Sequence, residues 1–289
     1  MSLEQSSIQG RMDTIKSIFQ QVQGIEINND NWPVVFEQLN ATDPVFRSVA
    51  YEAAAMNTAL ADLANGGELQ LWEHLATSTE AVPHLTQIHI GLGWALAQQQ
   101  VDATPYLPHL NPIMRYRVLD GYGYYEAMFR RRKSIVSKQA PEFLNGTALS
   151  AYYQGLGRCM WYLTNGNADA SISMLQSLDS EHHEDLWRGL GIAVTYVGCS
   201  DKTVLADILT KAGKHKPQLL TGAAMAAVSR NTAGNVTADT ECVIESWHEQ
   251  SVNQIVAKYK PGNNTAENAY DKWILEIENT ITEQLEAQM

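Results

Sequence analysis

The sequence has few cysteines, no long apolar run and a shortage of positive charge. Its three cysteines, Cys159, Cys199 and Cys242, are too few and too far apart for a disulfide framework or a zinc site. No stretch of about 18 apolar residues occurs, so we expect no transmembrane helix. The beginning of the chain lacks the basic and apolar regions of a signal peptide. These absences predict a reduced protein of the cytoplasm.

Basic residues are outnumbered by acidic ones, and the formal net charge is −12. An acidic chain is a poor nonspecific binder of nucleic acid or of an anionic membrane surface. The one basic run, Arg130-Arg131-Arg132-Lys133, is better explained as a helix end, where the helix dipole favours cations. We therefore predict no nucleic-acid partner.

Alternating strand patterns are also missing, and nearly every periodic segment has helical spacing. Residues 11–22, for example, place Met12, Ile15 and Phe19 on one helical face. Pro105, Pro108 and Pro112 predict an irregular or 3₁₀ connector. We expect further helices over 44–60, 68–76, 170–178, 202–212, 238–259 and from 265 onward.

The sequence does contain a repeated glycine pattern, which starts at Gly91, Gly121, Gly155, Gly189 and Gly222. The steps between these glycines are 30, 34, 34 and 33 residues. A fixed period of this size predicts tandem helix pairs. The expected fold is all-α, an α-solenoid or a closed α-toroid with repeats of about 34 residues. We expect residues 1–80 to pack on the array, 81–236 to form it, and 237–289 to cap it.

The repeat is Gly-x-Gly in four helices and Gly-Ala-Ala in the fifth. A glycine inside a helix costs about 0.8–1 kcal/mol relative to alanine, so close backbone approach must compensate. Residues i and i+2 lie about 200° apart around a helix, so each pair frees two nearly opposite sides. The five helices should therefore form one layer in which neighbouring backbones meet at glycine.

The remaining sides of each helix differ in chemistry. The residue between the glycines is always apolar and predicts a core face. The opposite face carries charged, amide and aromatic residues, and we name it the inner strip. In each helix it consists of three positions: the residue four before the first glycine, the residue directly before it, and the residue three after it. We predict a ligand-binding surface on this strip, formed by Trp94, Arg117, Asp120, Tyr124, Gln154, Arg158 and Arg188, with Trp161 added. A mixture of this kind suits a small ligand with an apolar body and a polar or anionic end. The alternative is that Arg117 with Asp120, and Asp185 with Arg188, are solvated ion pairs that only stabilise helices.

Candidates for acid–base chemistry are Asp120, Tyr124 and Glu126. Glu126 lies on an otherwise apolar face, where burial would raise its pKa and suit a general base. The alternative is a buried acid paired with Arg130, one turn further along. The run Glu181-His182-His183-Glu184 has the wrong spacing for two metal ligands on one helical face, and it fits a charged first helical turn. We predict no metal and no cofactor.

Three segments resemble a known bacterial family: Asp120-Gly121-Tyr122-Gly123-Tyr124-Tyr125, Gly155-Leu156-Gly157-Arg158-Cys159-Met160-Trp161 and Asp185-Leu186-Trp187-Arg188-Gly189-Leu190-Gly191. They are similar to UnbL-type enediyne biosynthesis proteins, which occur beside enediyne and polyene polyketide synthases. The resemblance covers roughly residues 85–235. It implies a role in making or handling a polyketide-derived product, and it implies no catalytic residues.

Three functions stay open on the sequence alone. The first is a helical-repeat accessory protein that binds a hydrophobic biosynthetic intermediate or a partner protein on its inner strip. The second is an enzyme that acts on a polyketide-derived substrate through acid–base residues in the same groove. The third is a protein–protein scaffold that uses its outer helices.

Overall fold

The computed structural model describes residues 8–262 and 265–287, and these residues contain helices and no strand. The α-helices are α1 (Ile8–Gln23), α2 (Trp32–Asn40), α3 (Arg47–Ala64), α4 (Gln70–Thr77), α5 (Leu85–Gln99), α6 (Arg117–Phe129), α7 (Gly146–Leu163), α8 (Ala168–Gln176), α9 (His183–Val197), α10 (Lys202–Ala212), α11 (Lys216–Thr232), α12 (Ala238–His248), α13 (Val252–Tyr259) and α14 (Ala269–Ala287). The all-α prediction is confirmed. Among the described residues, no helix combines the length and the apolarity needed to cross a bilayer.

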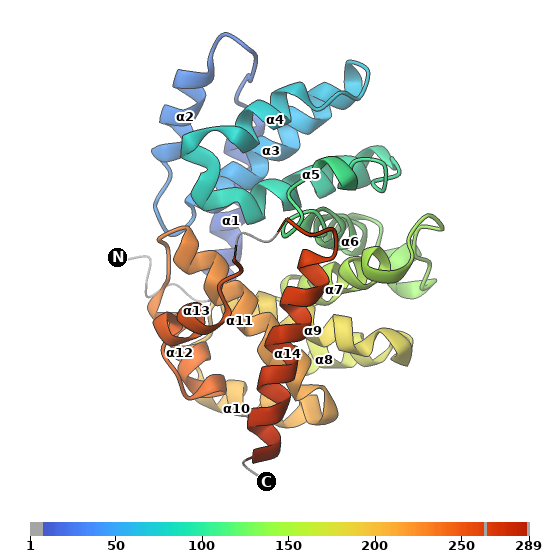
Figure 1. The fold of residues 1–289 in the computed structure, drawn as a ribbon, viewed down its shortest axis with the longest axis vertical. Helices are drawn as coiled ribbons and strands as arrows, with labels where there is room; N and C mark the ends of the chain where they lie inside the picture. The colour runs from blue at the N-terminus through green and yellow to red at the C-terminus, as the bar shows by residue number, and fades with distance from the viewer. Residues whose placement is uncertain (1–7, 263–264, 288–289) are drawn as a thin grey trace.

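Six helices lie side by side in one layer. Each packs on the next in the order α3, α5, α6, α7, α9 and α11, and Figure 1 shows α3 to α9 following one another down the molecule, with α11 beside α9. Shorter helices connect them: α4 packs on α3 and α5, α8 on α7 and α9, and α10 on α11. The glycine-bearing helices predicted from the sequence are five of these six.

Glycine is required wherever neighbouring layer helices meet. A Cβ atom at Gly155 would overlap the carbonyl oxygen of Asp120 in α6, and one at Gly157 would overlap that of Leu186 in α9. The two glycines of α7 therefore serve two different neighbours. The same holds for the glycine pairs of α5, α6 and α9, and Gly222 of α11 meets α9. The predicted close approach of backbones at glycine is confirmed.

These contacts keep a constant register along the layer. The first glycine of each helix meets the carbonyl of the residue just before the first glycine of the preceding helix; for Gly121 this residue is Ile90, and for Gly189 it is Gln154. The rule extends back to α3, because Gly91 meets the carbonyl of Glu52. Glu52 is followed by Ala53-Ala54-Ala55, so alanines in α3 take the places of the two glycines. Equivalent side chains of all six helices consequently share one face.

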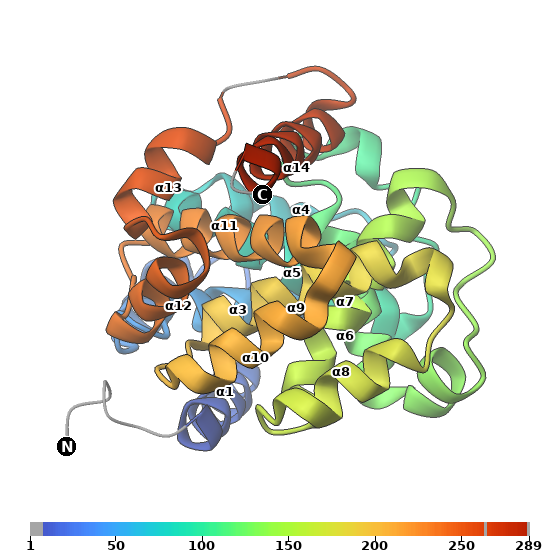
Figure 2. The ribbon, with the colours of Figure 1, turned by 90° about the horizontal axis from the view of Figure 1, so that it is seen from below.

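Two helices from the ends of the chain cover the layer. α1 packs on α3 and α9, and α14 packs on α11. In Figure 2, α14 lies at the top and α1 at the bottom, with the layer helices between them. Arg11 fixes α1 through an ion pair with Asp239 (2.6 Å) and a hydrogen bond to the carbonyl of Gly198 (2.8 Å).

Some elements differ from the sequence-based expectations. The single helix expected over 238–259 is wrong, because Glu249 adopts a left-handed conformation (φ 55°) and Ser251 starts α13 with a capping box to Gln254. The final helix starts at Ala269 rather than at 265, and the helix α2 was not predicted. The 3₁₀ connector is confirmed at Leu107–His109. The basic run does follow a helix end, since α6 stops at Phe129. The solenoid or toroid arrangement and the three-part division of the chain stay predictions.

Candidate functional site

A cavity of about 590 Å³ lies on the inner strip, between α1 and the layer. Its volume falls in the range typical of small-molecule sites. Met12, Ile15 and Phe19 of α1 form part of its wall. The layer helices contribute Val49, Glu52, Gln87, Ile90, Trp94, Arg117, Asp120, Tyr124, Arg158, Tyr162, Ile192, Tyr196 and Met225. The cavity is therefore largely apolar, with a few charged groups inside it.

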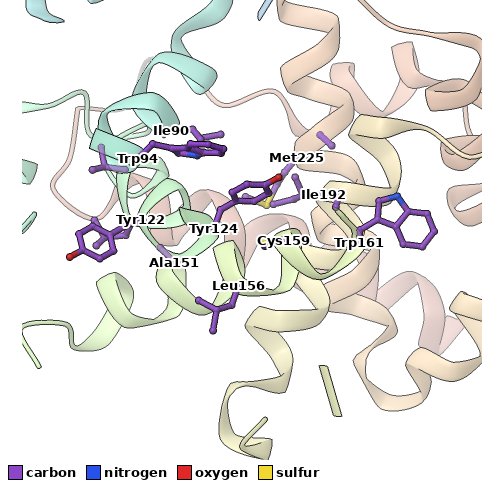
Figure 3. Close-up of a cluster of buried hydrophobic side chains, with 14 of the residues drawn as sticks. Ile90, Trp94, Tyr122, Tyr124, Ala151, Leu156, Cys159, Trp161, Ile192 and Met225 are labelled. Carbon is purple, nitrogen blue, oxygen red and sulfur yellow. The ribbon is translucent and has the colours of Figure 1, made fainter. Parts of the chain in front are cut away.

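An aromatic stack forms one wall of the cavity. Phe19 stacks on Trp94 with ring centroids 4.9 Å apart, and Trp94 stacks on Tyr124 at 5.0 Å. The guanidinium carbon of Arg158 lies 4.5 Å from the Tyr124 ring centroid and completes the stack with a cation–π contact. Figure 3 shows Trp94, Tyr124 and Met225 gathered in one region, with Tyr122 and Leu156 pointing elsewhere. Stacked rings of this kind hold the wall rigid and offer flat apolar surface.

Asp120 is buried and fully engaged. One carboxylate oxygen accepts a hydrogen bond from Nε of Arg158 (2.7 Å), and the other accepts one from the side-chain amide of Gln154 (2.6 Å). Burial opposes the charge of Arg158, but the nearby carboxylates of Asp120 and Glu52 outweigh it and raise its pKa. The Asp120 carboxylate and the Arg158 guanidinium thus form a buried ion pair. Because both oxygens are occupied, Asp120 is a poor general base in this state.

Glu52 is the contrasting carboxyl group. Its side chain lines the cavity and the residue is only 7% exposed, yet none of the described residues makes a hydrogen bond or an ion pair with it. Burial raises the pKa of Glu52 to about 7, although the charge of Arg158 acts in the opposite direction. Near neutral pH this carboxyl group therefore exists in both protonation states.

Arg117 is a buried cation that no acidic side chain of the described residues pairs with. It lines the cavity, is 4% exposed, and forms no hydrogen bond or ion pair to the side chain of any described residue. Its Nε is completely buried and unsatisfied. The guanidinium lies 5.8 Å from the ring centroid of Tyr270 and 5.7 Å from that of Trp273, both in α14. The predicted pair of Arg117 with Asp120 does not form, because Asp120 pairs with Arg158 instead.

The structure brings five of the predicted residues to the cavity: Trp94, Arg117, Asp120, Tyr124 and Arg158. Gln154 and Arg188 do not line it, because α14 covers their part of the inner strip. Gln154 contacts the hydroxyl of Tyr270, and Arg188 binds Glu278, both from α14. The i,i+3 pair of Arg188 with Asp185 is confirmed at 2.8 Å.

Trp161 and Glu126 also lie away from the cavity. Trp161 is fully buried, and Figure 3 shows its ring pointing away from Tyr124. Glu126 pairs with Arg130 at 2.5 Å, as the structural alternative predicted. Arg130 in turn donates to the carbonyl of Ala97 (2.6 Å) at the end of α5. Glu126 is thus held in a structural network away from the cavity.

Sequence reasoning missed Glu52 and the contribution of α1. A signal for Glu52 was present, since Ala53-Ala54-Ala55 is a small-x-small segment 38 residues before Gly91. Extending the repeat to alanine would have placed Glu52 in the same column as Ile90 and Asp120. No signal in the sequence indicated that α1 would cover this strip, because an amphipathic face does not identify the surface that it contacts.

The described residues contain no group of three or more His, Cys, Asp or Glu side chains that could hold a metal ion. A family model described as a protein of unknown function (DUF1702) matches residues 2–281. Comparisons with curated proteins and with solved structures give no match.

Proposed function

The chain belongs to the DUF1702 family of proteins of unknown function, and we propose that it binds a mainly apolar small molecule with an anionic end in the cavity between α1 and the layer. The main observation in support is the buried guanidinium of Arg117. A charged group is costly to bury without a partner, and buried polar groups in native proteins are nearly always satisfied. An anion of the ligand would satisfy the Arg117 guanidinium.

The charges around the cavity favour an anionic ligand. Asp120 and Arg158 neutralise one another, which leaves Lys16, Arg117 and the partly protonated Glu52. The local balance is therefore positive although the whole chain is acidic. The apolar and aromatic wall then accommodates the body of the ligand, while Arg117 fixes its orientation.

We place this ligand in polyketide-type biosynthesis as part of the proposal. Support comes from the sequence resemblance to enediyne-associated proteins, since an extended, unsaturated polyketide acid has the required apolar body and anionic end. We also propose that the six-helix layer is a solenoid of helix pairs, whose inner strip the ligand shares with α1 and α14. On this proposal the protein is an accessory factor that holds or delivers an intermediate.

Titration with cis-parinaric acid, a polyene carboxylate that fluoresces in apolar surroundings, tests the binding proposal. Trp94 lies in the cavity wall and should transfer excitation energy to the bound polyene. We expect saturable binding, and we expect Arg117→Met to weaken it by about ten- to a hundred-fold, the usual cost of losing a hydrogen bond to a charged group.

Arg115→Met provides a matched control. Arg115 is also a buried arginine, with 8% exposure, but it does not line the cavity. The Arg115→Met variant should therefore bind cis-parinaric acid with the affinity of the wild type. Equal affinity in the wild type and Arg117→Met, or equal losses in both variants, would remove the basis of the proposal.

A second candidate, acid–base catalysis, is favoured by one observation: Glu52 is a cavity carboxyl group whose pKa of about 7 suits proton transfer at neutral pH. The catalytic group would then be Glu52 rather than Glu126, and the hydroxyl of Tyr124 would be a neighbouring donor. Conversion of a polyketide-type substrate by the wild type, and its loss in Glu52→Gln with unchanged circular dichroism, would support an enzyme. Unaltered turnover in that variant would exclude Glu52 from the chemistry.

A further inference from the structure

The cavity contains two buried groups of opposite charge whose side chains form no hydrogen bond or ion pair with any described residue, and they belong to different helices. Glu52 is in α3 and Arg117 is in α6, with α5 between these two helices. The two side chains do not pair with each other. Both are more than nine-tenths buried and both line the same cavity. A single ligand that satisfies both groups must therefore carry polar atoms at two separate places.

Arg117 and Glu52 require different chemistry from that ligand. The guanidinium has only donors, so its partner must be an acceptor, and an anion is the strongest one. The Glu52 carboxyl, partly ionised near neutral pH, is mainly an acceptor and needs a donor. On α5, the helix between α3 and α6, Ile90 and Trp94 offer apolar and aromatic surface to the ligand.

We propose that the ligand is an apolar acid that also carries a hydroxyl group, with its carboxylate bound by Arg117 and its hydroxyl donating a hydrogen bond to Glu52. This inference rests on the proposed binding function and specifies its ligand class. A hydroxyl suits the Glu52 end better than an ammonium group, because a neutral donor loses less hydration on entering an apolar cavity. The proposal thus makes Arg117 the affinity group and Glu52 the group that selects among acids.

The two partnerships explain why these side chains are not neutralised within the fold. Elsewhere on the inner strip, Arg188 and Asp120 each have protein partners within hydrogen-bond distance. Had Glu52 and Arg117 only a structural role, leaving both without partners would destabilise the protein and give nothing in return. A ligand that satisfies both side chains removes this destabilisation. The site then discriminates between acids, because an acid that lacks the hydroxyl leaves Glu52 unsatisfied.

A comparison of ligands and variants tests the proposal. Calorimetry with the full chain would compare hexadecanoic acid with ω-hydroxyhexadecanoic acid, and decanoic acid with its ω-hydroxy form, because the length that spans both groups is set by the cavity. For at least one chain length, the hydroxy acid should bind about ten- to a hundred-fold more tightly than the plain acid. In Glu52→Leu this preference should disappear, while the plain acid should bind at least as well as to the wild type.

Thr86→Val is the control for a polar side chain at the same cavity, since Thr86 lines it and its hydroxyl contacts the sulfur of Met114. This variant should keep the preference for the hydroxy acid. The ω-amino acids form a further arm, and tighter binding of the amino than of the hydroxy form would overturn the choice of a hydroxyl. If plain and hydroxy acids bind equally at every length, the further inference fails while the binding proposal stands. If neither binds, the binding proposal itself fails.

Discussion

The inner strip is occupied in two different ways along one surface. Where α14 covers it, charges are satisfied within the protein: Glu278 binds Gln218 (2.7 Å) and Arg188 (3.4 Å), and Arg188 also binds Asp185. Where α1 covers it, a cavity remains, and the side chains of Glu52 and Arg117 form no hydrogen bond or ion pair with any described residue. The Arg117 guanidinium meets α14 only through the rings of Tyr270 and Trp273. Equivalent positions of one helix layer thus serve stability in one half and are left open in the other.

The difference shows that position on the strip does not decide a residue's role. Arg188 and Asp120 occupy the same place relative to the first glycine of their helices, but α14 engages only the first of them in a contact from outside the layer. The covering helix decides whether a side chain is used for packing or is free to meet a ligand. Substitutions in the seam that both halves share, and then in each half, test this division.

Gly155→Ala should produce the largest effect. Its Cβ would overlap the carbonyl oxygen of Asp120, and backbone cannot move aside as a flexible side chain can. We expect a loss of more than about 4 kcal/mol in the free energy of unfolding, or failure to fold. Urea denaturation followed by circular dichroism measures this.

Gly24→Ala is the matched control for that experiment. A Cβ there would make only an ordinary contact, 3.4 Å from the carbonyl oxygen of Gln21. It should change stability by less than about 1 kcal/mol. Similar small effects of both substitutions would show that the layer tolerates a wider separation of its helices than the structure indicates.

Arg188→Met and Arg117→Met should separate the two halves of the strip. Removing Arg188 leaves Asp185 and Glu278 without their cation, so we expect a loss of about 3 kcal/mol in stability with little change in ligand affinity. Arg117 forms no ion pair within the described part of the chain, so removing it should change the stability little or even raise it, while the ligand affinity falls. Denaturation and calorimetry on the same two samples measure both quantities. Reversed behaviour of the two arginines would contradict the division.

Glu52→Gln should have a smaller effect that depends on pH. The pKa of Glu52 is about 7 in the folded protein, above its ordinary value, so the folded state binds the proton more tightly than the unfolded state. The contribution of Glu52 to the free energy of unfolding of the wild type is therefore fully present at low pH, and it is lost as the pH rises from about 4.5 to about 7. The glutamine variant lacks this loss, and its stability advantage over the wild type should grow to about 3 kcal/mol at the upper end of this range.

Measuring that difference at several pH values isolates Glu52 from other titrating groups. Burial lowers the pKa values of His84, His89 and His248 to about 4, so the protein should also lose stability as pH falls below about 6.5. This loss is common to the wild type and the variant, and it cancels in the difference. A difference that stays constant with pH would mean that Glu52 titrates normally and has water or a partner near it.

The sequence predicted the local geometry of the layer because glycine spacing and helix geometry together determine it. Gly121 and Gly123 must lie on opposite sides of α6, whatever surrounds that helix. Helix geometry could not show in the same way that Arg188 and Gln154 lie outside the open part of the strip. That placement depends on where α14 docks, which is set by contacts between residues about 60 to 120 positions apart along the chain, such as Gln218 with Glu278. Such long-range contacts leave no periodic signal.

The seams between layer helices consist of main-chain atoms on both sides, with a carbonyl resting on a bare Cα. The carbonyl contacts at these glycines do not involve the side chains that line the cavity, and we expect conservative exchanges at Trp94, Tyr124 and Ile192 to leave the seams in place. An engineer who wished to hold a different molecule would need to redesign only the lining and the helix α1 that closes over it.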